Sequence, residues 1–328
     1  NHRARKIYRH KIGNLTEKDE LIFEEKSEAF TVSIGISSDE KYYFINTSDH
    51  NTSEQYYFGS SEEKPAPKLI IKREKGILYS INSWNNKFYN HTNKNAEDFK
   101  IDMCDDLKNQ NWKTFISGKD EVLIHGLTFL KNWIIRGETS NALDKLFVRN
   151  ISTNIEQELI FSDEKVYVPG VSLMQKNRDT DEIYLSYSSP KTPSRVYKFN
   201  LSNKSKKLVK EQEIPSGHDK DDYIVERVEF KSHDGRFVPL TITRHKKTPI
   251  DGSAKLLLYG YRVSISFVVI CRSRTARRFG SKYFELRRIR RAYQTAARGG
   301  PRLPLLLRAT SSGRRRHCRP HRRPHRRP

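Results

Sequence analysis

The sequence predicts an all-β propeller, present in part as about four to five blades, followed by the first strands of an α/β sheet. Three observations carry this prediction. The chain shows short alternating apolar runs between turn residues, with almost no helical periodicity. The runs come in groups of four, and the first run of each group begins near residues 31, 77, 122 and 166. Four strands in a repeat of about 40–50 residues are typical of a propeller blade.

The elements follow in order along the chain. Runs 6–12 and 19–25 have the character of two outer strands of an earlier blade, so we expect the inner strands to precede Asn1 and the chain to be truncated there. The four full groups are 30–37, 41–47, 54–59 and 68–72; 77–83, 86–92, 97–102 and 112–117; 121–130, 132–138, 143–151 and 156–161; and 165–174, 182–189, 194–201 and 207–214. A β-sandwich or a barrel also uses many short strands, but the regular period favours the propeller.

The regular four-strand repeat ends at Pro215. Runs 223–232 and 236–247 predict a hairpin at Asp234-Gly235, and 255–261 is a continuous apolar strand suited to the inside of an α/β sheet. We therefore expect three parts: a partial propeller over 1–214, the junction and first strands of a second domain over 215–267, and an unrelated tail over 268–328.

The charge of the chain is concentrated in that tail. Residues 268–328 hold 19 arginines, one lysine and one acid, whereas residues 1–267 hold 42 basic and 38 acidic side chains. The abrupt change from Lys- and Asn-rich to Arg-rich composition suggests a disordered tail that arose from a frameshift or another DNA source. The arginines would bind nucleic acid or any polyanion non-specifically through counterion release.

Composition also restricts the location of the protein. No run approaches the 18 or so apolar residues of a membrane-spanning helix, and residues 1–13 lack the apolar core of a signal peptide. The three cysteines Cys104, Cys271 and Cys318 form neither a disulfide framework nor a metal motif. We expect a cytoplasmic protein with no membrane partner.

Several segments resemble one family. The run 230–261, FKSHDGRFVPLTITRHKKTPIDGSAKLLLYGY, is similar to the start of the catalytic domain in the prolyl oligopeptidase family of serine peptidases, and most of all to its oligopeptidase B (protease II) group. Segments 187–201 and 210–227 and the residues around Thr52-Ser53-Glu54 add to the resemblance. It implies a seven-bladed propeller that caps an α/β-hydrolase domain, a peptidase without a cofactor, and short peptide substrates cleaved after Arg or Lys.

The sequence departs from the family after Tyr261. The chain continues as Arg262 and VSISFVVI, and the nucleophile motif G-x-S-x-G occurs nowhere in the 328 residues. The Ser–Asp–His triad is therefore absent, and we expect this chain to be an inactive fragment by itself. By resemblance only Tyr261 corresponds to a catalytic residue of the family, the tyrosine whose hydroxyl stabilises the oxyanion. The rival interpretation is a non-enzymatic propeller remnant whose basic tail binds nucleic acid.

Other candidate sites are weaker. Ser232, His233 and Asp234 are adjacent on a turn and lack the geometry of a catalytic relay. The acidic run Asp219, Asp221 and Asp222 lacks the glycine and distal glutamate of a calcium loop. We expect no metal site at the isolated histidines, which are His10, His50, His91, His125 and His218. Adventitious zinc binding is conceivable only in the tail, at His317, Cys318, His321 and His325.

Overall fold

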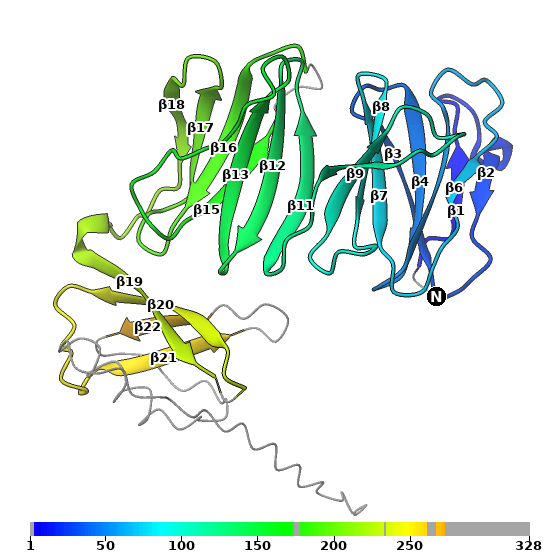
Figure 1. The fold of residues 1–328 in the computed structure, drawn as a ribbon. Coiled ribbons are helices and arrows are strands. Elements are labelled where there is room, and N and C mark those ends of the chain that lie inside the picture. The colour runs from blue at the N-terminus through cyan, green and yellow to red at the C-terminus, as the bar shows by residue number, and fades with distance from the viewer. Residues whose placement is uncertain (1–2, 174–177, 233, 261–266, 273–328) are drawn as a thin grey trace, which may run out of the picture. The chain divides into compact units, whose positions relative to one another are not determined.

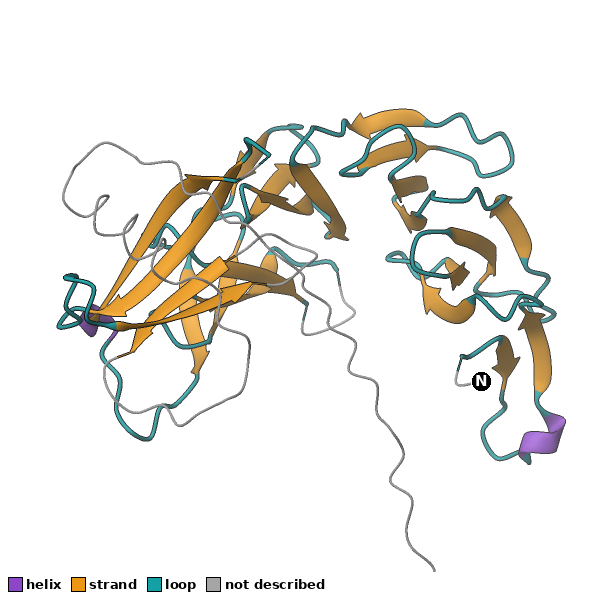
Figure 2. Ribbon diagram, turned by 90° about the horizontal axis from the view of Figure 1, so that it is seen from below, coloured by secondary structure: helices purple, strands orange, loops and turns teal. Residues whose placement is uncertain are grey.

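The computed structural model describes residues 3–173, 178–232, 234–260 and 267–272. Over these residues the protein is all-β, with two short 3-10 helices, Thr16–Lys18 and Lys220–Asp222, and no α-helix. The chain divides into two compact units, Asn1–Asp221 and Asp222–Pro328. Figures 1 and 2 show the strands of both units.

The first unit consists of a two-stranded sheet and four consecutive four-stranded sheets, all antiparallel. Within each sheet the spatial order of the strands follows the chain, as in a propeller blade. The strands are β1 (Lys6–Arg9) and β2 (Glu20–Glu24); β3 (Thr31–Ile36), β4 (Tyr42–Ser48), β5 (Ser53–Gly59) and β6 (Lys68–Ile71); β7 (Tyr79–Trp84), β8 (Lys87–Thr92), β9 (Lys100–Cys104) and β10 (Lys113–Ile116); β11 (Val122–Phe129), β12 (Trp133–Ser140), β13 (Leu143–Asn150) and β14 (Glu156–Glu158); and β15 (Val168–Ser172), β16 (Glu182–Ser188), β17 (Arg195–Asn200) and β18 (Lys206–Glu211). The predicted partial propeller is confirmed, and each of the four predicted groups forms one sheet.

Tight turns fix the strand register within the sheets. Asn85 and Asn86 connect β7 to β8, and Asn141 and Ala142 connect β12 to β13. Both residues of each pair have positive φ, 51° and 57° in the first turn and 48° and 52° in the second. Two-residue loops of this kind match the right-handed twist of the flanking strands, and asparagine tolerates the left-handed conformation well.

Apolar side chains bury the faces of neighbouring sheets against one another. One core joins β3–β6 to β7–β10, the next joins β7–β10 to β11–β14, and a third joins β11–β14 to β15–β18. Ile183 and Leu185 in the third core are completely buried. Alternate residues of a strand face opposite sides, so each of the three four-stranded sheets from β3 to β14 contributes to two clusters of buried side chains.

The second unit contains four strands, β19 (Tyr223–Lys231), β20 (Phe237–His245), β21 (Lys255–Gly260) and β22 (Phe267–Arg272). Their spatial order is β19-β20-β22-β21, and β20 and β22 run parallel. Leu240 and Ile242 of β20 form its core with Val228 and Phe230 of β19. The strand β22 crosses the position at which the sequence composition changes, because it continues to Arg272.

None of the helices in the described part of the chain is long and apolar enough to span a membrane.

Candidate functional site

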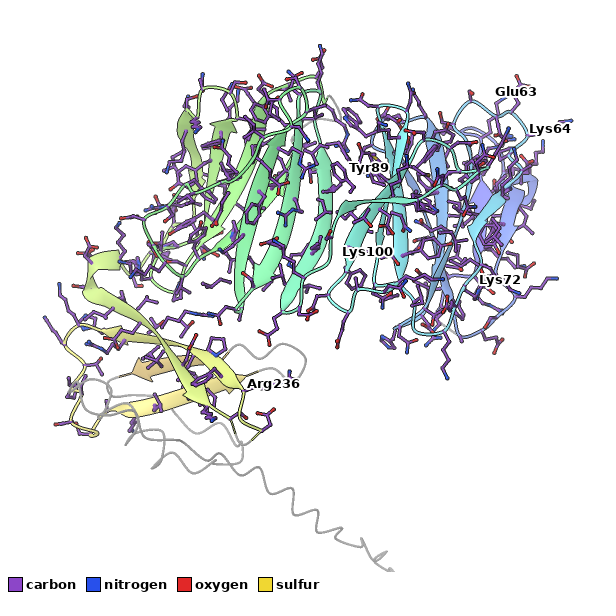
Figure 3. The ribbon with its side chains drawn as sticks, viewed as in Figure 1. Glu63, Lys64, Lys72, Tyr89, Lys100 and Arg236 are labelled. Carbon is purple, nitrogen blue, oxygen red and sulfur yellow. The ribbon has the colours of Figure 1, made fainter. Side chains whose placement is uncertain are left out.

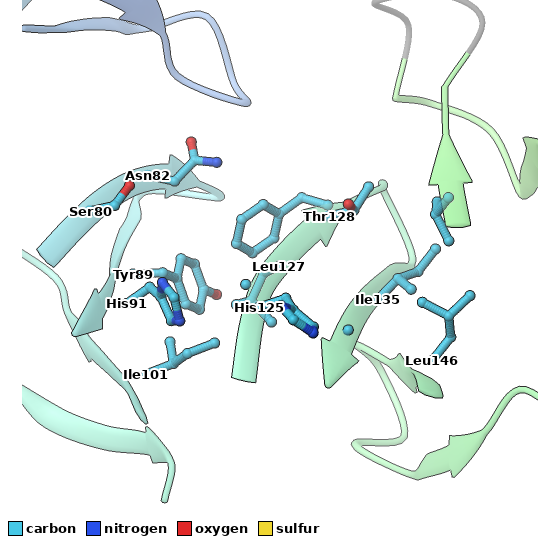
Figure 4. Close-up of a pocket in the computed structure, with 14 residues that line it drawn as sticks. Ser80, Asn82, Tyr89, His91, Ile101, His125, Leu127, Thr128, Ile135 and Leu146 are labelled. Carbon is cyan, nitrogen blue, oxygen red and sulfur yellow. The ribbon is translucent and has the colours of Figure 1, made fainter. Parts of the chain in front are cut away.

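A cavity of about 380 Å³ lies beside β11, the first strand of the third four-stranded sheet (Figure 4). Side chains from β7, β8, β9, β11, β12, β13 and β15 line it. Its polar lining consists of Ser80, Asn82, Tyr89, His91, His125 and Thr128. Its apolar lining consists of Ile101, Leu127, Phe129, Ile135, Leu146 and Val171.

A β-bulge in β11 shapes the middle of the cavity. The pairing of β11 with β12 shifts between Ile124 and Gly126, and Gly126 adopts a φ of +133°, which is a conformation that favours glycine. The opposite residue on β12 is Gly137. A Cβ atom at Gly137 would lie 3.6 Å from the Cβ of His125, which is ordinary van der Waals contact, so His125 packs directly over β12 at this residue.

His91 lies on the side of the cavity that β8 forms. Its Nε2–H donates to the backbone carbonyl of Ile124 at 2.7 Å, and its ring stacks on Phe99 with 4.5 Å between centroids. Burial lowers the pKa of His91, and the neighbouring His125 lowers it further. His91 is therefore a neutral imidazole at pH 7, and its Nδ1 atom is a hydrogen-bond acceptor.

His125 has the same tautomer for a different reason. The hydroxyl of Thr139 donates its single proton to Asp144, so it accepts the 2.6 Å hydrogen bond from Nε2–H of His125. With the proton on Nε2, the Nδ1 atom of His125 is then also an acceptor. The hydrogen bonds of both rings go to other groups, so the cavity holds no serine–histidine pair of the kind that activates a nucleophile.

A second polar cluster lies between the two-stranded sheet and the first four-stranded sheet. The guanidinium of Arg73 bonds to Glu25 at 2.6 Å and to both carboxylate oxygens of Glu54, and its plane lies 4.1 Å over the ring of Phe30. Burial alone would raise the pKa of Glu54, but hydrogen bonds from Arg73 and from the hydroxyl of Tyr56 outweigh burial and lower it. Because each buried charge has a partner, we interpret this cluster as structural.

The predicted site residue Tyr261 and the weaker candidates are placed as follows. Tyr261 and His233 lie outside the described residues, as does the whole set in the tail, His317, Cys318, His321 and His325. Ser232 and Asp234 lie in the turn between β19 and β20, where Asp234 accepts a hydrogen bond from the backbone of Arg236 at 3.2 Å.

Three of the residues that were considered and rejected as metal ligands have local partners. His10 bonds to Asp19 at 2.6 Å, His218 bonds to the carbonyl of Lys191 at 2.8 Å, and Asp222 pairs with Lys246 at 2.7 Å. His50 is exposed. Over the described ranges no group of three or more His, Cys, Asp or Glu side chains is arranged to hold a metal ion.

The cavity itself was not predicted from the sequence. His91 and His125 were treated as isolated histidines, because they are 34 residues apart and share no motif. The repeat period could have predicted that the two histidines lie on neighbouring sheets, since it places His91 on the second strand of one sheet and His125 on the first strand of the next.

The chain is similar to several known proteins. The model of a family described as prolyl oligopeptidase, N-terminal beta-propeller domain, matches residues 1–212. Dipeptidyl aminopeptidase BI of Pseudoxanthomonas mexicana is 27% identical over 262 residues, which are 79% of this chain and 36% of the relative. Protease 2 of Moraxella lacunata is 27% identical over 257 residues, which are 78% of this chain and 36% of the relative. The chain thus spans little more than a third of the length of these relatives.

Two solved structures have a fold similar to that of this chain. Oligopeptidase B from Trypanosoma brucei with covalently bound antipain superposes with a TM-score of 0.74 at 22% sequence identity, covering 82% of this chain and 42% of that chain. Oligopeptidase B from Leishmania major gives a TM-score of 0.73 at 18% identity, with the same coverage.

Proposed function

This chain belongs to the prolyl oligopeptidase family, and from that membership we propose that it is the propeller, joined to the first strands of the catalytic domain, of a serine oligopeptidase similar to oligopeptidase B. The intact enzyme would hydrolyse short peptides after Arg or Lys in the cytoplasm. The observation that carries the proposal is the family match over residues 1–212 together with the likeness of 230–261 to the start of the catalytic domain. Two relatives of the chain are named dipeptidyl aminopeptidase and protease.

The proposed reaction proceeds through an acyl-enzyme. A serine attacks the peptide carbonyl, a histidine takes the serine proton and passes it to the leaving amine, and an aspartate orients the histidine. The serine cannot be assigned within the chain, because it contains no G-x-S-x-G motif, and the resemblance to the family assigns no residue of the chain as the aspartate or the histidine. Loss of the serine or the histidine costs about 10⁶ in kcat in a comparable serine peptidase, so we propose that the chain is inactive alone.

A chimera tests the function directly. Residues 1–260 replace the matching segment of the Moraxella lacunata protease 2, and turnover of a short fluorogenic peptide ending in Arg is measured for the chimera and for the purified chain. We expect the chimera to be active and sensitive to a serine-directed inhibitor, and the chain alone to show no turnover. A folded but inactive chimera would contradict the proposed function, and turnover by the chain alone would contradict the absence of a triad.

We further propose that the hydroxyl of Tyr261 donates to the oxyanion in the intact enzyme, by its place in the family resemblance. An oxyanion donor contributes about 10²–10³ in kcat. The chimera extended to Tyr261 and its Tyr261→Phe variant measure this, with a fall in kcat and little change in KM as the expected result. Equal kcat values for the two would exclude the role.

A further inference from the structure

Resting on the proposed peptidase function, we propose that the cavity beside β11 binds an uncharged, apolar segment of a short peptide, whose backbone N–H groups donate to Nδ1 of His91 and of His125. This binding site lies within the first unit of the chain. It differs from a site for a basic side chain, because no acidic residue lines the cavity; the carboxylate of Asp144 contacts His125 from outside the lining, 3.9 Å from Nε2.

The lining of the cavity selects against charge. None of the residues that border it is Asp, Glu, Lys or Arg. Transfer of an unpaired ammonium or guanidinium group into such surroundings is costly, whereas an apolar side chain gains from contact with Leu127 and Val171, which are only partly buried. The cavity therefore favours apolar over basic peptide residues.

The two imidazoles supply hydrogen-bond acceptors at fixed positions. The Nε2–H of His91 is bonded to Ile124 and that of His125 to Thr139, which leaves Nδ1 of each ring as the acceptor. Over the described residues, neither Nδ1 atom receives a hydrogen bond from the protein. Peptide N–H groups are the donors that an extended chain presents at regular intervals, so they suit two acceptors that border one cavity (Figure 4).

The size and setting of the cavity agree with this ligand. A volume of about 380 Å³ lies within the range of roughly 300–1,000 Å³ for small-molecule sites. The lining combines six apolar side chains with six uncharged polar ones, among them Tyr89, Asn82 and Ser80, and such polar groups can fix the orientation of a ligand. Figure 3 shows Tyr89 within the side chains of the first unit.

Binding of two blocked tripeptides to the full-length chain tests the proposal. N-acetyl-Ala-Leu-Ala amide and N-acetyl-Ala-Arg-Ala amide are titrated and followed by isothermal calorimetry and ligand-observed NMR. Neither peptide carries a carboxylate, which excludes attraction to the arginine-rich tail. We expect the leucine peptide to bind at least tenfold more tightly than the arginine peptide.

Three variants locate the binding. His125 and His91 are each replaced by Phe, and the exposed His50→Phe is the matched control. We expect roughly fivefold weaker binding of the leucine peptide for His125→Phe and for His91→Phe, and no change for His50→Phe. Because the side chain of His125 is half-exposed, its variant is expected to keep the thermal unfolding midpoint of the parent, and it decides the question if His91→Phe unfolds.

Equal affinity for the two peptides, no binding at millimolar concentration, or undiminished binding by a folded His125→Phe variant would each overturn the proposal. These results are distinguishable from failure of the proposed peptidase function, because they require no turnover. An active chimera with no peptide binding to this cavity would leave the function standing and exclude the site.

Discussion

Arg73 and Glu54 form a bidentate pair, in which Nε donates to Oε2 at 3.1 Å and Nη2 donates to Oε1 at 3.0 Å. The backbone N–H of Arg73 adds a third bond to Oε2 at 2.8 Å. The same guanidinium reaches Glu25, which follows β2 directly. One arginine therefore ties the two-stranded sheet to the first four-stranded sheet through two carboxylates that are more than nine-tenths buried.

Replacement of Arg73 by Met is predicted to lower the free energy of unfolding by about 3 kcal/mol, because it leaves two buried carboxylates without a counterion. Guanidinium unfolding followed by far-UV circular dichroism measures the loss. Lys94→Met is the control, since Lys94 pairs with Glu74 at 2.8 Å but both side chains are more than half exposed, and we expect it to cost less than about 1 kcal/mol. Equal losses for the two variants would refute the structural role of the cluster.

The pH dependence of stability should report on the same carboxylate. The pKa of Glu54 is lower in the folded protein than in the unfolded chain, so the unfolded chain binds a proton first as the pH falls. Its contribution is complete above the unfolded pKa of about 4.3 and is lost as the pH falls below that value through the folded pKa. We expect Glu54→Gln to be less stable at pH 7 and to lose less stability than the parent between pH 5 and 3. The exposed Glu63→Gln should keep the slope of the parent, and a Glu54→Gln slope equal to the parent's would contradict the prediction.

The alternation of apolar residues made the strands predictable. Burial of aromatic rings explains why the observed ends of β14 and β15 differ from the predicted ones. The run 156–161 was predicted as one strand, but β14 ends at Glu158, and β15 begins at Val168 instead of 165. Between them Phe161 and Tyr167 turn inward and pack edge-on at 5.5 Å, and both contact Tyr187. Burial of three aromatic rings outweighs continued strand pairing here, and no period-2 pattern reveals that choice.

The candidate site could not be predicted from sequence motifs for a related reason. His91 and His125 come together only because two successive sheets stack, and His125 lies within the bulge of β11 between Ile124 and Gly126. A bulge depends on the pairing of two strands, so it is difficult to predict from the sequence of either strand alone.

Tyr79→Phe is predicted to destabilise the protein by about 2 kcal/mol. The hydroxyl of Tyr79 donates to the carbonyl of Ile71 and accepts from the backbone N–H of Gln55 at 2.8 Å, where the pairing of β5 and β6 shifts register. Without the hydroxyl the buried N–H of Gln55 loses its partner. Tyr184→Phe, on β16, is the matched control with an expected change below about 0.5 kcal/mol. Chemical unfolding measures both, and indistinguishable midpoints would show that the hydroxyl of Tyr79 contributes nothing.

Ile81 and Ile34 each lie on the first strand of a four-stranded sheet but differ in burial, so we predict that their replacement lowers the free energy of unfolding by different amounts. Ile81 of β7 is 3% exposed, because the first four-stranded sheet covers it, whereas Ile34 of β3 is 42% exposed. The cluster beside β3 combines side chains of its own sheet with apolar side chains from β1 and β2, and it buries Val32 but leaves Ile34 open to solvent. Ile81→Thr removes buried methylene groups and places a hydroxyl in the core, so we expect a loss of about 2–3 kcal/mol.

Ile34→Thr should cost less than about 0.5 kcal/mol, since an exposed β-branched residue replaces another on a strand. Urea unfolding of both variants at equal protein concentration gives the comparison. A loss at Ile34 as large as that at Ile81 would mean that this face of β3 is covered in solution, and sedimentation velocity on the parent would then show whether a second copy of the chain covers it.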